Sequence, residues 1–156
     1  MVTRSLKAFL KCERGTQMIE FALLLPFLIL LFAGVVEMGR MFYTYTTLQK
    51  STEVGARYLS SKLVTNGSYA SADTSAATNL IVCGKTTSCS GLTPVASNLT
   101  SSNVSITPPG TGTGTRYVTV KVTYAYQPLV FSLGYVTGSS QLSINFTPAI
   151  TMRDML

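Results

Sequence analysis

The chain has 156 residues, of which 46% are hydrophobic and only 12% charged, so it is long enough for one modest domain and an appendage. Half of its formal charge of +6 lies in the first fifteen residues, and the other Lys and Arg residues are scattered without a basic run. This distribution argues against nucleic-acid binding.

The inventory of reactive side chains argues against catalysis. There is no His and no Trp, and beyond residue 63 the only carboxylates are Asp73 and Asp154. Paired-carboxylate hydrolysis, a Ser-His-Asp triad and a carboxylate metal site each need residue types that this region lacks. The sequence therefore predicts a protein that is not an enzyme and that uses no cofactor.

The first element is a short basic leader, residues 1–15, followed by a run without charge from Phe21 to Val36. As a helix this run measures roughly 24 Å, and its apolar flanks extend it to the roughly 30 Å of a bilayer core. The excess of Lys and Arg before the run predicts a single-pass anchor with a cytoplasmic N-terminus and an exported remainder. A cleaved secretory signal is the alternative, but Ala33-Gly34-Val35 is a weak cleavage site for it.

Beyond the span the apolar residues become one-sided, which indicates an amphipathic helix. We expect one continuous helix from about Thr16 to about Leu63, roughly 70 Å long, with a kink or a loosened turn at Pro26. The predicted apolar face consists of Met38, Phe42, Tyr45, Leu48, Thr52, Ala56, Leu59 and Leu63.

The middle of the chain predicts a short helix from about Ala72 to Val82. Cys83 and Cys89 follow it on the exported side, where an oxidising environment favours a disulfide. Two thiolates in a chain without His do not make a metal site, because Cys12 is expected on the other side of the membrane.

The last third alternates with period two, which predicts antiparallel strands. One face is expected to hold Val118, Val120, Val122, Tyr124 and Tyr126, and a second strand to hold Leu142, Ile144, Phe146 and Ile150. A shorter strand from Asn103 to Thr107 precedes a turn or flexible loop over residues 108–114. Leu129, Val130, Phe131, Leu133, Tyr135 and Val136 form a further apolar cluster that fits a core, a membrane-proximal loop or a partner surface, with core as the default.

These elements predict an α+β protein in which a long N-terminal transmembrane and amphipathic helix packs on a small antiparallel β-sheet. The expected domains are a leader at 1–15, the helix at 16–63, and an exported α+β or all-β domain at 64–156.

Glu20 is a carboxylate near the edge of hydrocarbon, where its cost is up to roughly 3 kcal/mol unless it is paired. One explanation is that it lies at the water interface and favours the helix start through the dipole. The other is that the chain is cut after Gly15, so that Thr16 gains an ammonium group and Glu20 becomes the fifth residue.

The stretch from Glu13 to Phe21, with the apolar run after it, resembles a class III prepilin signal. The continuation Val36-Glu37-Met38-Gly39-Arg40-Met41-Phe42-Tyr43, with Leu48-Gln49-Lys50 and Glu53-Val54-Gly55-Ala56-Arg57-Tyr58, resembles the TadE-like family of minor pilins, or pseudopilins, from tight-adherence (Flp) type IV pilus systems. Val120 to Tyr124 and Ile150 to Arg153 are similar to the far end of those proteins.

The resemblance implies a pilin-like fold and cutting by prepilin peptidase between Gly15 and Thr16. It implies that Glu20, next to Phe21, pairs with the new amine of Thr16. The implied partners are prepilin peptidase, other minor and major pilins, the inner-membrane assembly platform and membrane lipid. The implied location is the bacterial inner membrane or the assembled pilus, where the protein would help to initiate or cap a pilus used for surface adherence.

Two other functions stay open at this point. One is an uncleaved, single-pass, membrane-anchored interaction module of a secretion or pilus assembly complex. The other is an exported domain that binds a ligand through its tyrosines.

Overall fold

The computed structural model describes residues 13–65, 67–110, 116–129 and 143–155. The chain divides into two compact units, Met1–Gly39 and Arg40–Leu156. It is an α+β protein with a long apolar helix and small antiparallel sheets, as predicted.

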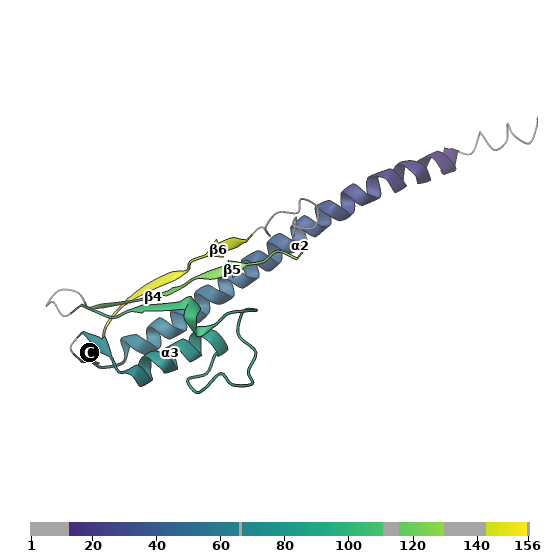
Figure 1. The fold of residues 1–156 in the computed structure, drawn as a ribbon. Coiled ribbons are helices and arrows are strands. Elements are labelled where there is room, and N and C mark those ends of the chain that lie inside the picture. Colours follow the sequence, from purple (N-terminus) through teal and green to yellow (C-terminus); the bar gives the residue numbers. More distant parts are fainter. Residues whose placement is uncertain (1–12, 66, 111–115, 130–142, 156) are drawn as a thin grey trace, which may run out of the picture. The chain divides into compact units, whose positions relative to one another are not determined.

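The long helix is α2, Glu13–Ser60, and it is continuous through Pro26 (Figure 1). It begins three residues before the predicted start at Thr16. It also ends three residues before the predicted end at Leu63, which is 71% exposed. The backbone turns directly after the helix, where the Lys62 N–H donates to the Leu59 carbonyl at 3.0 Å.

The predicted apolar face of α2 is correct in its central part. Leu48, Thr52, Ala56 and Leu59 are fully buried. The hydroxyl of Thr52 donates to the Leu48 carbonyl at 2.7 Å, which satisfies this polar group inside the core. The prediction is wrong toward the ends of the face, because Met38, Phe42, Tyr45 and Leu63 are exposed.

The second helix, α3, spans Ser71–Cys83, one residue more at each end than predicted. It buries Ala77, Ile81 and Val82 and ends at Gly84, whose φ of 72° is a left-handed conformation that suits glycine. Gly55 of α2 lies directly against it, since a Cβ added at that position would overlap the side chain of Ile81. Glycine therefore permits the close approach of the two helices.

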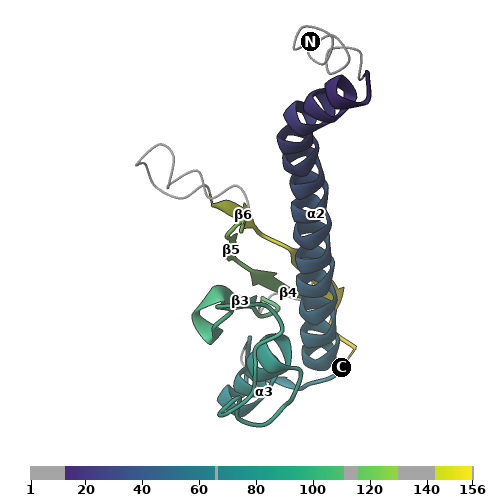
Figure 2. The same cartoon turned by 90° about the vertical axis from the view of Figure 1, so that its right-hand side faces the viewer.

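Among the described residues, the strands form one three-stranded and two two-stranded antiparallel sheets rather than the single predicted sheet. Figure 2 shows β3 and β4 of the first of these sheets, and β5 and β6 of another. The first has the order β3-β4-β7, with β3 at Val104–Thr107, β4 at Tyr117–Val122 and β7 at Ala149–Arg153. β5, Tyr124–Tyr126, pairs with β6, Ile144–Phe146, and β1, Val64–Thr65, pairs with β2, Ser68–Tyr69.

The break between the two larger sheets has a local cause. Pro148 lies between β6 and β7 and has no N–H to donate to a ladder, while its carbonyl accepts the N–H of Val122 at 3.0 Å. The next residue, Thr123, donates its N–H to Asn103 at 2.8 Å instead of continuing the pairing of β4.

The core of the second unit follows the predicted alternation of strand residues. Val118, Val120, Val122, Tyr124 and Tyr126 are all buried and cluster with the buried face of α2 and with Ile81 of α3.

Other parts of the strand prediction fail or cannot be compared. Ile144 is 40% exposed, so its predicted place in the core is wrong, and Leu129 is 71% exposed and also not core. The remainder of the second apolar cluster, Leu142 and residues 111–114 of the predicted turn lie outside the described residues.

Candidate functional site

The apolar part of α2 has the composition and length of a membrane span. Its side chains are exposed around the whole helix, for example Met18 at 75%, Leu23 at 76% and Phe32 at 66%. This apolar stretch is long enough to cross a bilayer, and none of the other described residues buries it. A helix that is apolar on every side needs an apolar surrounding, which a bilayer or neighbouring helices supply.

The predicted processing site lies at the start of this helix. Gly15, Thr16 and Glu20 are exposed, and a Cβ added at Gly15 would meet nothing within 4 Å. The peptide between Gly15 and Thr16 lies within α2, near Glu13, where the described part of the helix begins.

Thr16 and Glu20 are one turn apart and lie on the same side of α2. Helical side chains lean toward the N-terminus, so the carboxylate of Glu20 is directed back toward the backbone of Thr16. Phe21 follows at 55% exposure and continues the apolar surface beside the acid. This geometry can bring a new amine at Thr16 and the Glu20 carboxylate together.

The comparison with known families concerns this same segment. Residues 15–57 match the family model described as TadE-like protein. Over these residues the chain is similar to TadE-like proteins. The match begins at Gly15 and ends within α2, so α3 and the sheets lie outside it. No curated protein and no solved structure matched the chain.

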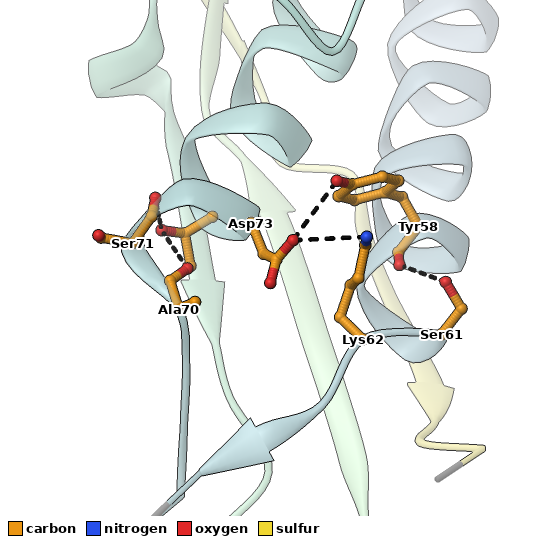
Figure 3. Close-up of polar contacts among 7 residues, drawn as sticks. Tyr58, Ser61, Lys62, Ala70, Ser71 and Asp73 are labelled. Carbon is orange, nitrogen blue, oxygen red and sulfur yellow. Dashed lines mark hydrogen bonds and ion pairs between the residues drawn. The ribbon is translucent and has the colours of Figure 1, made fainter.

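Directly after the TadE-like segment, three side chains join α2 to α3 (Figure 3). Lys62 lies 3.5 Å from the carboxylate of Asp73 and 4.7 Å from the ring centroid of Tyr58, and the Tyr58 hydroxyl donates to Asp73 at 3.5 Å. Tyr58, and secondarily Asp73, raise the pKa of Lys62 above its ordinary value. The cluster is a structural link at the junction of the two helices.

The cysteines lie beyond the TadE-like segment. The structure joins Cys83 and Cys89 in a disulfide with their Cα atoms 5.9 Å apart. The bond closes the loop after α3, and the chain that follows is tied back by the Val95 N–H, which donates to the Val82 carbonyl at 2.8 Å. Within the described ranges, no group of three or more His, Cys, Asp or Glu side chains could hold a metal ion.

The tyrosines are distributed over several surfaces. Tyr69, Tyr124 and Tyr126 belong to the core, whereas Tyr43 on α2 and Tyr117 on β4 are exposed at 74% and 54%. The core tyrosines are not available to a ligand, which weakens the hypothesis of a tyrosine-based binding domain.

An open groove lies at the end of α2 and β7. Arg57, Arg116, Arg153 and Asp154 line it together with Ser60, Ser61 and two methionines. Arg57 is already paired with Glu53 at 2.7 Å, so part of the positive charge is balanced within the chain.

Proposed function

We propose that this chain is a minor pilin, or pseudopilin, of a Tad (Flp) pilus that prepilin peptidase cuts between Gly15 and Thr16. The observation that carries the proposal is the TadE-like match, which starts at Gly15 and covers the exposed apolar part of α2. Such a helix is suited to anchor the protein in the bacterial inner membrane and to pack laterally on other pilin helices. The exported part would then help to initiate or cap a pilus for surface adherence.

The proposed cleavage explains the acid at the start of the span. Hydrolysis of the peptide consumes one water and leaves a carboxylate on Gly15 and an ammonium on Thr16. Glu20 lies one turn from that ammonium, so the two charges can neutralise each other in one subunit or between neighbours. Neutralisation offsets the cost, up to about 3 kcal/mol, of a lone carboxylate near hydrocarbon. The chain itself takes no catalytic part and acts through prepilin peptidase, other pilins and the assembly platform.

One observation favours an alternative function. Because α2 begins at Glu13, the peptide to be cut is helical, and a protease must unwind the first turn to reach it. An uncleaved, membrane-anchored interaction module of the same assembly complex would keep this turn intact.

Intact mass measurement of the membrane-extracted protein separates the two functions. In a host with active prepilin peptidase, we expect the wild-type chain to lack residues 1–15. A Gly15→Leu variant should retain them, and its side chain has room in the helix because a Cβ at Gly15 meets nothing within 4 Å. A wild-type protein that still begins at Met1 would overturn the processing proposal and support the uncleaved module.

A further inference from the structure

The second unit carries exposed apolar side chains at one end. They are Phe42 at 58%, Tyr43 at 74%, Leu129 at 71% and Ile144 at 40% exposure, and we call these four residues the apolar rim. Two of them belong to α2, and two belong to β6 or to the chain just after β5. Exposed aromatic and aliphatic groups from separate segments indicate a surface that contacts something apolar.

β6 and β7 run along α2 in the same direction as the helix, which can be followed from contacts at two levels. At one level the Met155 N–H donates to the Ser60 carbonyl at 3.0 Å, just after β7. At the other, the rings of Tyr45 and Phe146 meet edge to face with centroids 5.6 Å apart. Between these levels, the extended chain from Phe146 to Met155 covers up to roughly 30 Å, and the helix from Tyr45 to Ser60 covers roughly 23 Å.

The pairing of β5 with β6 extends this alignment by two residues of strand. Phe146 is paired with Tyr124, and Ile144 is paired with Tyr126, roughly 7 Å farther along the strand. That shift corresponds to between four and five helical residues, so Ile144 lies at about the level of Arg40 and Met41, within one helical turn of Phe42. Figure 1 shows β5 and β6 beside α2 within this unit, where the Tyr45 and Phe146 rings are in contact.

Three rings hold the hairpin in this position. Phe146 contacts Tyr45 of α2 on one side and Tyr126 of β5 on the other, with both centroid distances at 5.6 Å. Tyr126 is 3% exposed, so the hairpin is fixed to the core at the base of the rim. The rim is therefore part of the packed unit and not a loose appendage.

The opposite end of the same unit has the opposite character. Three arginines and Asp154 line the groove beside Ser60, where strands β4 and β7 begin and end. Within the second unit, the charged groove therefore lies at the end where α2 stops, and the apolar rim lies at the end where α2 enters the unit.

We propose that the apolar rim is seated in the headgroup layer of the bilayer that α2 spans. If hydrocarbon extends to about Met38, Phe42 lies roughly 6 Å beyond it, which matches the roughly 5–8 Å of polar headgroup layer on each side of a bilayer. Aromatic side chains are enriched at that depth. The inference rests on the membrane anchoring in the proposed function and is independent of cleavage at Gly15.

The chain has no Trp, so a single introduced Trp reports its own surroundings. We would place Trp by Ile144→Trp in the rim and by Tyr117→Trp at the remote end of β4, where Tyr117 is 54% exposed. The full chain is reconstituted in vesicles of phosphatidylcholine and phosphatidylglycerol and checked by flotation. Brominated acyl chains should quench Ile144→Trp severalfold more than Tyr117→Trp, and aqueous iodide should show the reverse order.

Each other outcome rejects the inference in a distinct way. Equal access of iodide to both positions in vesicles that float with protein would reject the lipid contact while leaving the anchor intact. Protection of Ile144→Trp from both quenchers would assign the rim to a second copy or another protein. Failure to float would reject the anchor and the lipid contact together.

Two further variants remove the remaining ambiguities. Leu129→Trp, at a position with 71% exposure, repeats the test if Ile144→Trp disturbs the hairpin. The same quenching in a Gly15→Leu background shows that the result does not depend on processing, so failure of the cleavage proposal is recognised separately.

Discussion

Two tyrosine hydroxyls in the core of the second unit differ in their hydrogen bonding. The Tyr124 hydroxyl donates to the Ser97 carbonyl at 2.8 Å. The Tyr69 hydroxyl is buried without a hydrogen-bond partner, as is one carboxylate oxygen of Asp154. Burial, with a smaller contribution from the negative charge of Asp154, raises the pKa of Tyr69 to about 12. The hydroxyl of Tyr124 is therefore expected to stabilise the folded state, and the hydroxyl of Tyr69 to destabilise it.

We predict that Tyr124→Phe lowers the free energy of unfolding by about 1 kcal/mol at pH 7, because it leaves the Ser97 carbonyl without its donor. Tyr69→Phe should cause no loss and a gain of up to about 1 kcal/mol, since it removes a buried, unpartnered hydroxyl. Denaturant unfolding of the detergent-solubilised full chain measures both. Equal losses would show that Tyr69 has a hydrogen-bond partner in solution.

The pKa of Tyr69 also gives this pair of variants a pH signature. The unfolded state releases the phenolic proton near pH 10, and the folded state holds it to about pH 12. Stability is therefore complete below pH 10 and declines between about pH 10 and 12 as the unfolded chain ionises. Burial raises the pKa of Tyr124 as well, so Tyr69→Phe should reduce this alkaline decline without abolishing it.

Among the elements, α2 and α3 depend on one glycine for their close approach. We predict that Gly55→Ala lowers the free energy of unfolding by roughly 1 kcal/mol, because overpacking against Ile81 outweighs the gain in helix propensity. Gly39→Ala in the same helix is the control, since its Cβ would meet nothing within 4 Å, and it should be neutral or stabilising. Thermal unfolding compares them, and two equal effects would contradict the close contact.

The disulfide, which closes the loop after α3, is the second contact expected to stabilise the arrangement of the elements. Replacing Cys83 and Cys89 together by Ser should lower stability by roughly 2 kcal/mol, the loop-closure estimate for a ring of this size. A reducing agent should lower the melting temperature of the wild-type protein to about that of the double variant. It should leave the melting temperature of the double variant unchanged. Labelling of free thiols in the unreduced, unfolded protein at Cys83 or Cys89 would show that the bond does not form.

The elements with regular periodicity were predictable from the sequence. The buried positions of α2 from Leu48 to Leu59, and the alternation from Val118 to Tyr126, follow from side-chain direction alone. The division of the strands into separate sheets was not predictable, because it depends on the hydrogen bonds around Pro148 and Thr123. These bonds join distant parts of the chain.

The β1–β2 hairpin was missed although its turn carries a signal. Residues 66 and 67 are Asn-Gly, a pair that favours two-residue hairpin turns, and Gly67 has a φ of 75°. The flanking strands have only two residues each, too short for a period to appear. Ala96 and Leu99 are buried in irregular chain, where no periodic pattern could identify them.

The candidate site at the start of α2 was found from sequence because its signal is a linear one. Gly15, Thr16 and Glu20 are close together along the chain and need no tertiary contact to be recognised. The apolar rim was missed because it joins Phe42 to Ile144, and only the alignment of the hairpin along α2 brings these residues to within about one helical turn of each other along the helix axis.

At the scale of the whole molecule, the two units are suited to different surroundings. The first exposes apolar side chains along α2, whereas the second buries its apolar residues in a core. A pilus subunit has this requirement, because one part must exchange lipid for neighbouring helices during assembly while the other must stay folded. In the proposed role as a pilus subunit, assembly should therefore depend on groups in the first unit that change the folded state of the second very little.

Glu20 provides the test. We predict that Glu20→Ala leaves cleavage after Gly15 largely intact but weakens co-purification with partner pilins, because the new ammonium of Thr16 loses its counter-charge. The cost of up to about 3 kcal/mol corresponds to at most a roughly hundredfold loss of affinity. Glu53→Ala is the matched control on the same helix, since Glu53 pairs with Arg57 at the surface and should leave co-purification unchanged. If both variants retain their partners equally, Glu20 does not act in assembly, and its place at the helix start is explained by the dipole alone.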